Sequence, residues 1–180
     1  MMDPVRELKI RAELLHTRLA SNDAEALTRL RALPELRRAD EAALVAAVPG
    51  IRRKHCLAVV ARECGFSSWE RARLALEGQP EAPELGTLLY GRDGSVLHPW
   101  FATYDEARAH VEARAEAPRS YLLTYKHHFF VADRAFVASL GLDPDDPDWQ
   151  AIGWDWARPA DPAARSRLYA KRLATMRGKA

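Results

Sequence analysis

The feature that most restricts the fold is a break at Gly78–Gly86, where the sequence GQPEAPELG holds two prolines and two glycines in nine residues. Proline and glycine interrupt regular elements, so this stretch predicts a linker between two differently built parts. The composition changes across it, because four of the five tryptophans and all five tyrosines lie beyond residue 80. We therefore predict a helical part at 1–78, a linker at 79–85 and a smaller mixed part at 86–180.

The first part has the periodicity of amphipathic helices. Its first helix carries apolar residues at alternating spacings of three and four, on one face: Val5, Leu8, Ala12, Leu15 and Leu19. Capping residues and helix breakers predict four more helices, at about 22–33, 40–50, 51–64 and 67–78. Together these patterns predict an N-terminal five-helix bundle.

The second part has short runs of β-forming residues separated by turn residues. The candidate strands form two hairpins and lie at 86–90, 95–101, 121–125 and 128–132. Helical patterns that are expected to cover the sheet begin near Tyr104, Asp133 and Asp161. The predicted class is α+β, with the five-helix bundle followed by a small antiparallel sheet of two hairpins covered by helices.

Composition and charge exclude several classes of protein. Hydrophobic residues make up 48%, charged residues 29%, and the mean hydropathy is -0.34, which is typical of a globular chain. No apolar run approaches the roughly 20 residues of a membrane-spanning helix, and charges interrupt the start of the chain, unlike in a signal peptide. We therefore expect a cytoplasmic protein with no membrane partner. The net charge of +2 is also far below that of strongly basic nucleic-acid-binding proteins.

The most specific motif is LAVVARECGFSSWERARLAL, which predicts a helix, a tight glycine turn and a second helix over 57–76. It resembles the helix-turn-helix of transcription regulators of the arabinose-regulator type at four positions, Ala61, Gly65, Phe66 and Ser67. Arg71 departs from that pattern, because it stands where the second helix normally buries an apolar residue. The resemblance implies DNA binding through the second helix.

The same motif, through its Gly-Phe-Ser-Ser-Trp sequence, also resembles a helical segment found beside ankyrin-like repeats in bacterial proteins of unknown function. That resemblance extends from the first helix to Glu77 and implies a fold rather than an activity. Both families need a close helix corner, in which Gly65 turns the chain, Phe66 fills the corner and Trp69 packs from the next helix. Three interpretations stay open: a structural corner, a DNA-reading motif and a groove for a partner protein.

Polar residues near this motif are the candidate contacts for a protein partner or for nucleic acid. On the second helix the candidates near its start are Ser68, Glu70, Arg71 and Arg73. On the preceding helix the candidates for contacts to a phosphate backbone are Arg52, Arg53 and Lys54. Cations at a helix N-terminus oppose the helix dipole, which favours a reason other than local stability for their presence.

Histidines in the second part are candidates for acid–base catalysis. Strand alternation places Tyr125 and His127 on one face and His128 on the other. His98, in the first predicted hairpin, would meet them across the sheet. An imidazole with a pKa of about 6.5 suits proton transfer at neutral pH, so these four residues are candidate catalytic groups. The competing interpretation is a hairpin end with polar turn residues.

Tryptophans supply the other candidate site. The cluster Trp149, Trp154, Asp155 and Trp156 spans eight residues, and Trp100 belongs to the first predicted hairpin. Bulky indoles of this kind either close the core of a small sheet or line a cleft for a partner. These five residues form the candidate pocket.

No cofactor and no metal are expected. The sequence lacks a glycine-rich phosphate loop, a nucleophile elbow, a Cys-x-x-Cys pair and a His-Glu-x-x-His helix. Cys56 and Cys64 are eight residues apart in one predicted helix, about 12 Å, which is beyond disulfide reach, so we expect two free buried thiols.

The leading functional hypothesis is a cofactor-free binding or adaptor protein. It would act on a protein partner through the tryptophan-rich region, the helical corner or both. Two alternatives remain: a DNA-binding regulator that uses the helix-turn-helix-like motif, and a small acid–base enzyme with a pocket of histidine, tyrosine and tryptophan.

Overall fold

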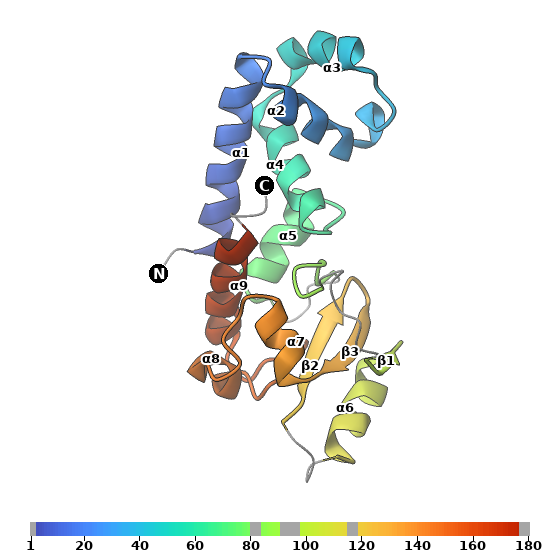
Figure 1. Cartoon of the computed structure of the whole chain (residues 1–180), viewed down its shortest axis with the longest axis vertical. Helices are drawn as coiled ribbons and strands as arrows, with labels where there is room; N and C mark the ends of the chain where they lie inside the picture. The colour runs from blue at the N-terminus through green and yellow to red at the C-terminus, as the bar shows by residue number, and fades with distance from the viewer. Residues whose placement is uncertain (1–2, 80–83, 91–97, 115–118, 177–180) are drawn as a thin grey trace.

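The computed structural model describes residues 3–79, 84–90, 98–114 and 119–176. Within these ranges the chain forms nine α-helices and one three-stranded antiparallel sheet, arranged as in Figure 1. The predicted α+β class is confirmed. No helix in the described ranges is both long enough and apolar enough to cross a membrane.

The helical part begins at α1 and ends at α5. The α-helices are α1 (Pro4–Ala20), α2 (Ala24–Arg29), α3 (Glu41–Ala47), α4 (Arg53–Glu63) and α5 (Trp69–Leu76). Short 3-10 turns lie at Leu30–Ala32, Pro34–Leu36 and Val48–Gly50. Side chains that accept a first-turn backbone N–H cap four of the helices: Asp3, Asp23, Asp40 and Ser68. Short polar residues therefore set where these helices start.

The sheet contains β1 (Trp100–Phe101), β2 (Tyr121–Tyr125) and β3 (His128–Ala132), in the spatial order β1-β3-β2. β2 and β3 form the second predicted hairpin, with Tyr125 opposite His128 across a two-residue turn. The prediction of a first hairpin is wrong in its first strand, because 86–90 is a turn segment that joins no ladder. The remainder of that hairpin, 91–97, lies outside the described residues, and β1 instead pairs with β3.

Helices cover the sheet and connect it to the helical part. Their bounds are α6 (Tyr104–Glu112), α7 (Arg134–Ser139), α8 (Pro147–Ala151) and α9 (Pro162–Met176). α6 packs against all three strands, whereas α8 packs on α9 and α9 packs along α1. Figure 1 shows α9 beside the start of α1, so the end of the chain returns to its beginning.

The buried core is continuous across the sequence break at 78–86. One hydrophobic cluster runs from Val5 in α1 to Leu173 in α9. It includes two cross-strand pairs of the hairpin, Tyr121 with Ala132 and Leu123 with Phe130. Polar contacts cross the same boundary: Arg11 donates to the Leu173 carbonyl at 2.7 Å, and Ser166 donates to the Leu76 carbonyl at 3.2 Å. The helical part and the sheet are therefore packed together.

Residues 84–87, at the end of the break, connect the helical corner to the hairpin, and we call them the bridging segment. The Thr87 N–H donates to the Cys64 carbonyl at 2.9 Å, beside the corner glycine. On its other side, the Lys126 N–H donates to the Gly86 carbonyl at 2.7 Å, and the Leu85 N–H donates to the Lys126 carbonyl at 3.2 Å. These backbone bonds hold the β2–β3 turn next to the α4–α5 corner.

Gly65 is required at the corner, and replacing it with valine should lower the free energy of unfolding by about 2 kcal/mol or more. Its φ is +81°, and a Cβ there would lie 2.3 Å from the Thr87 side chain. Gly50→Ala is the matched control, because nothing lies within 4 Å of a Cβ at that position. Urea denaturation of both variants checks this; equal stabilities would show that the corner does not depend on glycine.

Candidate functional site

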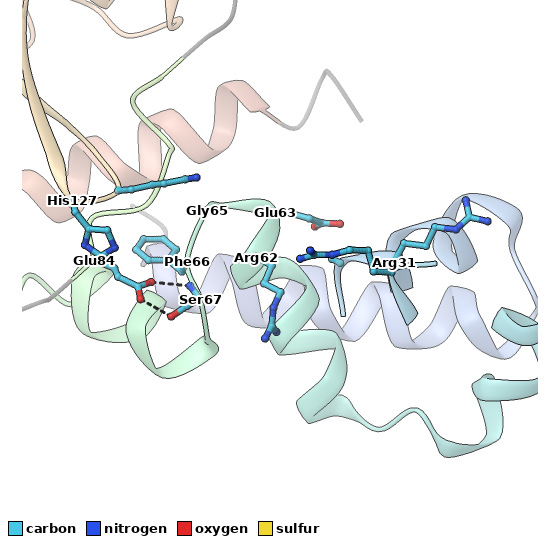
Figure 2. Close-up of a pocket in the computed structure, with 11 residues that line it drawn as sticks. Arg31, Arg62, Glu63, Gly65, Phe66, Ser67, Glu84 and His127 are labelled. Carbon is cyan, nitrogen blue, oxygen red and sulfur yellow. Dashed lines mark hydrogen bonds between the residues drawn. The ribbon is translucent and has the colours of Figure 1, made fainter. Parts of the chain in front are cut away.

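A groove with a volume of about 500 Å³ lies where the α4–α5 corner meets the β2–β3 turn. We call it the corner groove. The corner contributes Gly65, Phe66 and Ser67, and the hairpin contributes Lys126 and His127. Figure 2 shows His127 and Glu84 at one end and Arg31 at the other. The groove is thus built from residues up to 96 positions apart in the sequence, Arg31 and His127.

Four permanent cations line the corner groove: Arg31, Arg37, Arg62 and Lys126. None of the four forms an ion pair with a carboxylate of the described residues. Arg31 uses its Nε to donate to the Ala39 carbonyl at 3.2 Å, a neutral acceptor. The charges of these side chains are therefore available to a bound anion.

The two carboxylates of the corner groove already have partners. Glu63 accepts a bidentate pair of hydrogen bonds from Arg29, each 2.8 Å long, which neutralises its charge. Glu84 accepts hydrogen bonds from both the backbone N–H and the hydroxyl of Ser67. Burial alone would raise the pKa of Glu84, but the bonds from Ser67 outweigh burial and hold that pKa below its ordinary value. The net charge of the lining is positive.

Local packing fixes the shape of the groove. Phe66 is buried at the corner, as predicted, and Trp69 packs partly buried against the same core. Gly86 has a φ of +67°, and a Cβ there would lie 2.6 Å from the Phe66 ring, so the bridging segment approaches the corner closely. Lys126 has a φ of +56°, which is unfavourable for a residue with a Cβ. The turn therefore has a lysine at a position where glycine would have less backbone strain.

The candidate contacts on α4 are separated from those on α5. Arg52, Arg53 and Lys54 are exposed at the start of α4, and Arg53 pairs with Glu13 of α1 at 2.6 Å. The eleven residues of α4 place this end about 15 Å along the axis from the corner. These cations are therefore far from the candidate contacts at the start of α5. This separation argues against a pair of helices that reads DNA together.

Two of the candidate side chains at α5 already have partners in the same helix or at its ends. Ser68 caps the helix by accepting the Arg71 N–H at 3.3 Å, and Arg73 pairs with Glu77 at 2.8 Å. Glu70 and Arg71 are exposed. The Glu84 carboxylate accepts hydrogen bonds from Ser67 just before α5, and its negative charge opposes a phosphate on the first turn of that helix. This arrangement favours a structural corner over insertion of α5 into a DNA groove.

The candidate catalytic residues do not come together. Lys126 and His127 form the turn, so the prediction that His127 alternates with Tyr125 on one strand face is wrong; Tyr125 is paired with His128. His98 packs its ring against Phe136, with centroids 4.5 Å apart, instead of facing the turn. The corner groove is lined by His127, without His98, Tyr125 or His128.

The tryptophans divide between core and surface. Trp149 and Trp156 have no exposed surface, so they close the core and line no open cleft. Trp154 is half-buried beneath the Arg119 guanidinium, which lies 4.2 Å from its ring centroid. Trp100 is exposed on β1. The predicted pocket of five residues is therefore not assembled as one site.

Asp155 has a structural role within the tryptophan-rich segment. This buried carboxylate accepts a hydrogen bond from the Tyr104 hydroxyl at 2.7 Å and bonds from the Ala157 and Arg158 N–H groups. Burial and this bond raise the pKa of Tyr104 to about 12. Backbone bonds on either side of Asp155 attach the segment to Leu122 of β2. Asp155 therefore ties α6 to the sheet edge.

Sequence reasoning missed the four cations of the corner groove. Arg31 and Arg37 belong to the arginine-rich stretch RALPELRR, which was a possible signal. Nothing in the sequence marks Arg62 or Lys126 as a binding residue, because Arg62 is one of several charged residues on a helix and Lys126 is a single charge in a turn. Their meeting depends on the tertiary structure.

Comparisons with protein-family models, with curated proteins and with solved structures found no match. Among the described residues, no group of three or more histidine, cysteine, aspartate or glutamate side chains is arranged to hold a metal ion. The geometry of the corner groove is thus the basis for a functional proposal.

Proposed function

We propose that this protein is a cofactor-free binding protein that holds an anionic chain in the corner groove. One observation carries the proposal: Arg31, Arg37, Arg62 and Lys126 line one groove without carboxylate partners in the described part of the chain. Unpaired cations at one site repel one another, so an arrangement of this kind favours a ligand of opposite charge. The ligand class is a chain bearing phosphate or carboxylate groups.

Arginine suits this role because its planar guanidinium donates two parallel hydrogen bonds to a carboxylate or phosphate. Three of the four cations are arginines: Arg31 lies in the 3-10 turn Leu30–Ala32, Arg37 directly follows the 3-10 turn Pro34–Leu36, and Arg62 lies on α4. Lys126 adds a point charge from the turn between β2 and β3. Cations from different segments of the chain can therefore contact successive charges of one extended ligand.

The polar groups of the corner groove support binding rather than catalysis. Ser67 donates its hydroxyl directly to Glu84, so no histidine stands between this serine and the carboxylate. Activation of a serine nucleophile requires a general base, normally histidine, at the hydroxyl, with the carboxylate behind it. The Ser67–Glu84 pair instead fixes the bridging segment to the start of α5.

We expect inorganic polyphosphate to bind the full-length protein, and Arg62→Gln to weaken that affinity about tenfold. The loss follows from removing one charge-assisted contact. Arg6→Gln is the matched control, because Arg6 is exposed on α1 and does not line the groove. Isothermal titration calorimetry measures each affinity. Equal affinities of the two variants, or no binding by the unaltered protein, would overturn the proposal.

Lys126→Gly provides a variant that should fold at least as well as the unaltered protein. Glycine tolerates the φ of +56° at this turn, while the backbone bonds to Gly86 and Leu85 remain possible. We expect unchanged or higher thermal stability together with weaker polyphosphate binding. This combination separates loss of a ligand contact from loss of folding.

A further inference from the structure

We infer that the anionic chain of the corner groove is a single-stranded nucleic acid whose bases stack on an aromatic cluster beside Lys126. The inference rests on the proposed function, because it assigns the phosphates of the strand to the groove cations. The cluster consists of Tyr90, Trp100 and Tyr125. A basic groove that continues into aromatic rings is the arrangement that recognises single strands.

The aromatic cluster starts where the groove ends. Lys126 lines the groove, and its Nζ lies 5.4 Å from the centroid of the Tyr125 ring. The Tyr125 centroid is 4.8 Å from that of Tyr90 and 5.9 Å from that of Trp100. One side chain therefore links the cationic lining to a group of three rings in mutual contact.

Two of these rings are exposed although they are large and apolar. Tyr90 is 40% exposed and Trp100 is 44% exposed. Among the described residues, the other exposed large hydrophobic side chains are the aliphatic Leu14 and Val45. The exposed aromatic surface is thus concentrated beside the groove, where a ligand that leaves the groove would meet it.

The exposed indole is held in place by buried neighbours. Trp100 stacks on Phe130 with centroids 4.8 Å apart and an interplanar angle of 24°. Phe130 is completely buried, and it is the register partner of Trp100 on β3. A ring fixed in this way loses little freedom on binding, which favours stacking of a flat ligand.

A single strand is the anionic chain that uses both features. Its phosphates match the groove cations, and its unstacked bases offer flat faces to the rings. In a duplex the base faces are hidden, and an acidic peptide or polyphosphate has no such faces. The aromatic cluster therefore favours a single strand over these other polyanions.

The test compares a fluorescently labelled twelve-residue oligothymidylate with inorganic polyphosphate on the full-length protein. We expect Trp100→Ala to weaken oligothymidylate binding about 5- to 150-fold, the usual effect of losing one base–aromatic stack. The affinity of Trp100→Ala for polyphosphate should stay within about twofold of that of the unaltered protein, because polyphosphate binding depends on the cations alone. Trp100→Phe should restore most of the oligonucleotide affinity, and Leu14→Ala, an exposed apolar residue on α1, should change neither affinity.

Salt dependence gives a second readout. If four phosphates are neutralised, the plot of log affinity against log salt concentration for the oligonucleotide should have a slope of about −3, reduced by about 0.7 in Arg62→Gln. Trp100→Ala should lower the affinity without changing that slope. A merely structural effect of the tryptophan would lower polyphosphate affinity as well.

The outcomes separate this inference from the proposed function. Polyphosphate binding that depends on Arg62, together with oligonucleotide binding that is indifferent to Trp100, would overturn the inference and leave the proposed function standing. Tighter binding of the matching duplex or of a glutamate-rich peptide would also overturn it. Failure of every polyanion to bind would overturn both.

Discussion

Replacing Trp156 with alanine is expected to lower the free energy of unfolding by about 3–5 kcal/mol. The side chain is completely buried, and its ring contacts those of Trp149 and Tyr169 with centroids 5.5 and 4.7 Å away. Tyr169 belongs to α9, so the substitution empties the place where the tryptophan-rich segment meets the last helix. Chemical denaturation followed by circular dichroism measures the loss.

Trp100→Ala serves as the matched control, because the same side chain is removed from a position with 44% exposure. Trp100→Ala should lower the free energy of unfolding by a clearly smaller amount, since much of this indole is already in contact with water. A loss for Trp156→Ala no greater than that of the control would mean that Trp156 belongs to a loosely packed cleft. That outcome would favour the tryptophan pocket that the sequence left open.

The second large effect concerns the thiol of Cys64. Burial raises its pKa to about 12. Because the thiolate is the reactive form, Cys64 in the native protein at pH 8 should react with a disulfide reagent on the order of 10³-fold more slowly than an unfolded cysteine. Exclusion of the reagent from the core slows the reaction further. The measurement uses Cys56→Ala, so that a single thiol is followed.

The raised pKa also gives the sign of a pH dependence. The folded state keeps the Cys64 thiol protonated where the unfolded chain has already ionised it. Its contribution to stability is therefore fully present below about pH 9 and is lost as the pH rises toward about 12. Rapid reaction of the native protein at pH 8, at the rate seen in denaturant, would contradict the buried position of Cys64.

Local features of the sequence determined most of the secondary structure. The stripe of apolar residues on α1 and the cap at Asp40 are consequences of contacts within a few residues, so they are readable from spacing alone. The cap of α5 was predicted one residue too early, at Ser67, whereas Ser68 caps the helix and Ser67 bonds to Glu84. The positive φ of Gly65 follows in the same way from a helix that must end and turn. The bounds of the β2–β3 hairpin were readable from alternation and a polar turn, although the same alternation also placed His127 on a strand face when it lies in the turn.

Whether a tryptophan is buried or exposed was decided by the tertiary structure. Trp149 and Trp100 have the same chemistry, yet one lies in the core and the other on an edge strand. Periodicity shows which residues share a face of an element, but it does not show what covers that face. In this chain α8 packs on α9, and that contact removes Trp149 from solvent.

The corner groove also exists only because of the tertiary structure. The sequence by itself determined the glycine corner, the helix caps and the hairpin, because each depends on neighbours a few residues away. It did not determine that Arg31 and Lys126 line one groove, since they are separated by 95 positions. The bridging bonds of Gly86 and Thr87 bring the hairpin turn to the corner, and only this long-range packing brings their charges together.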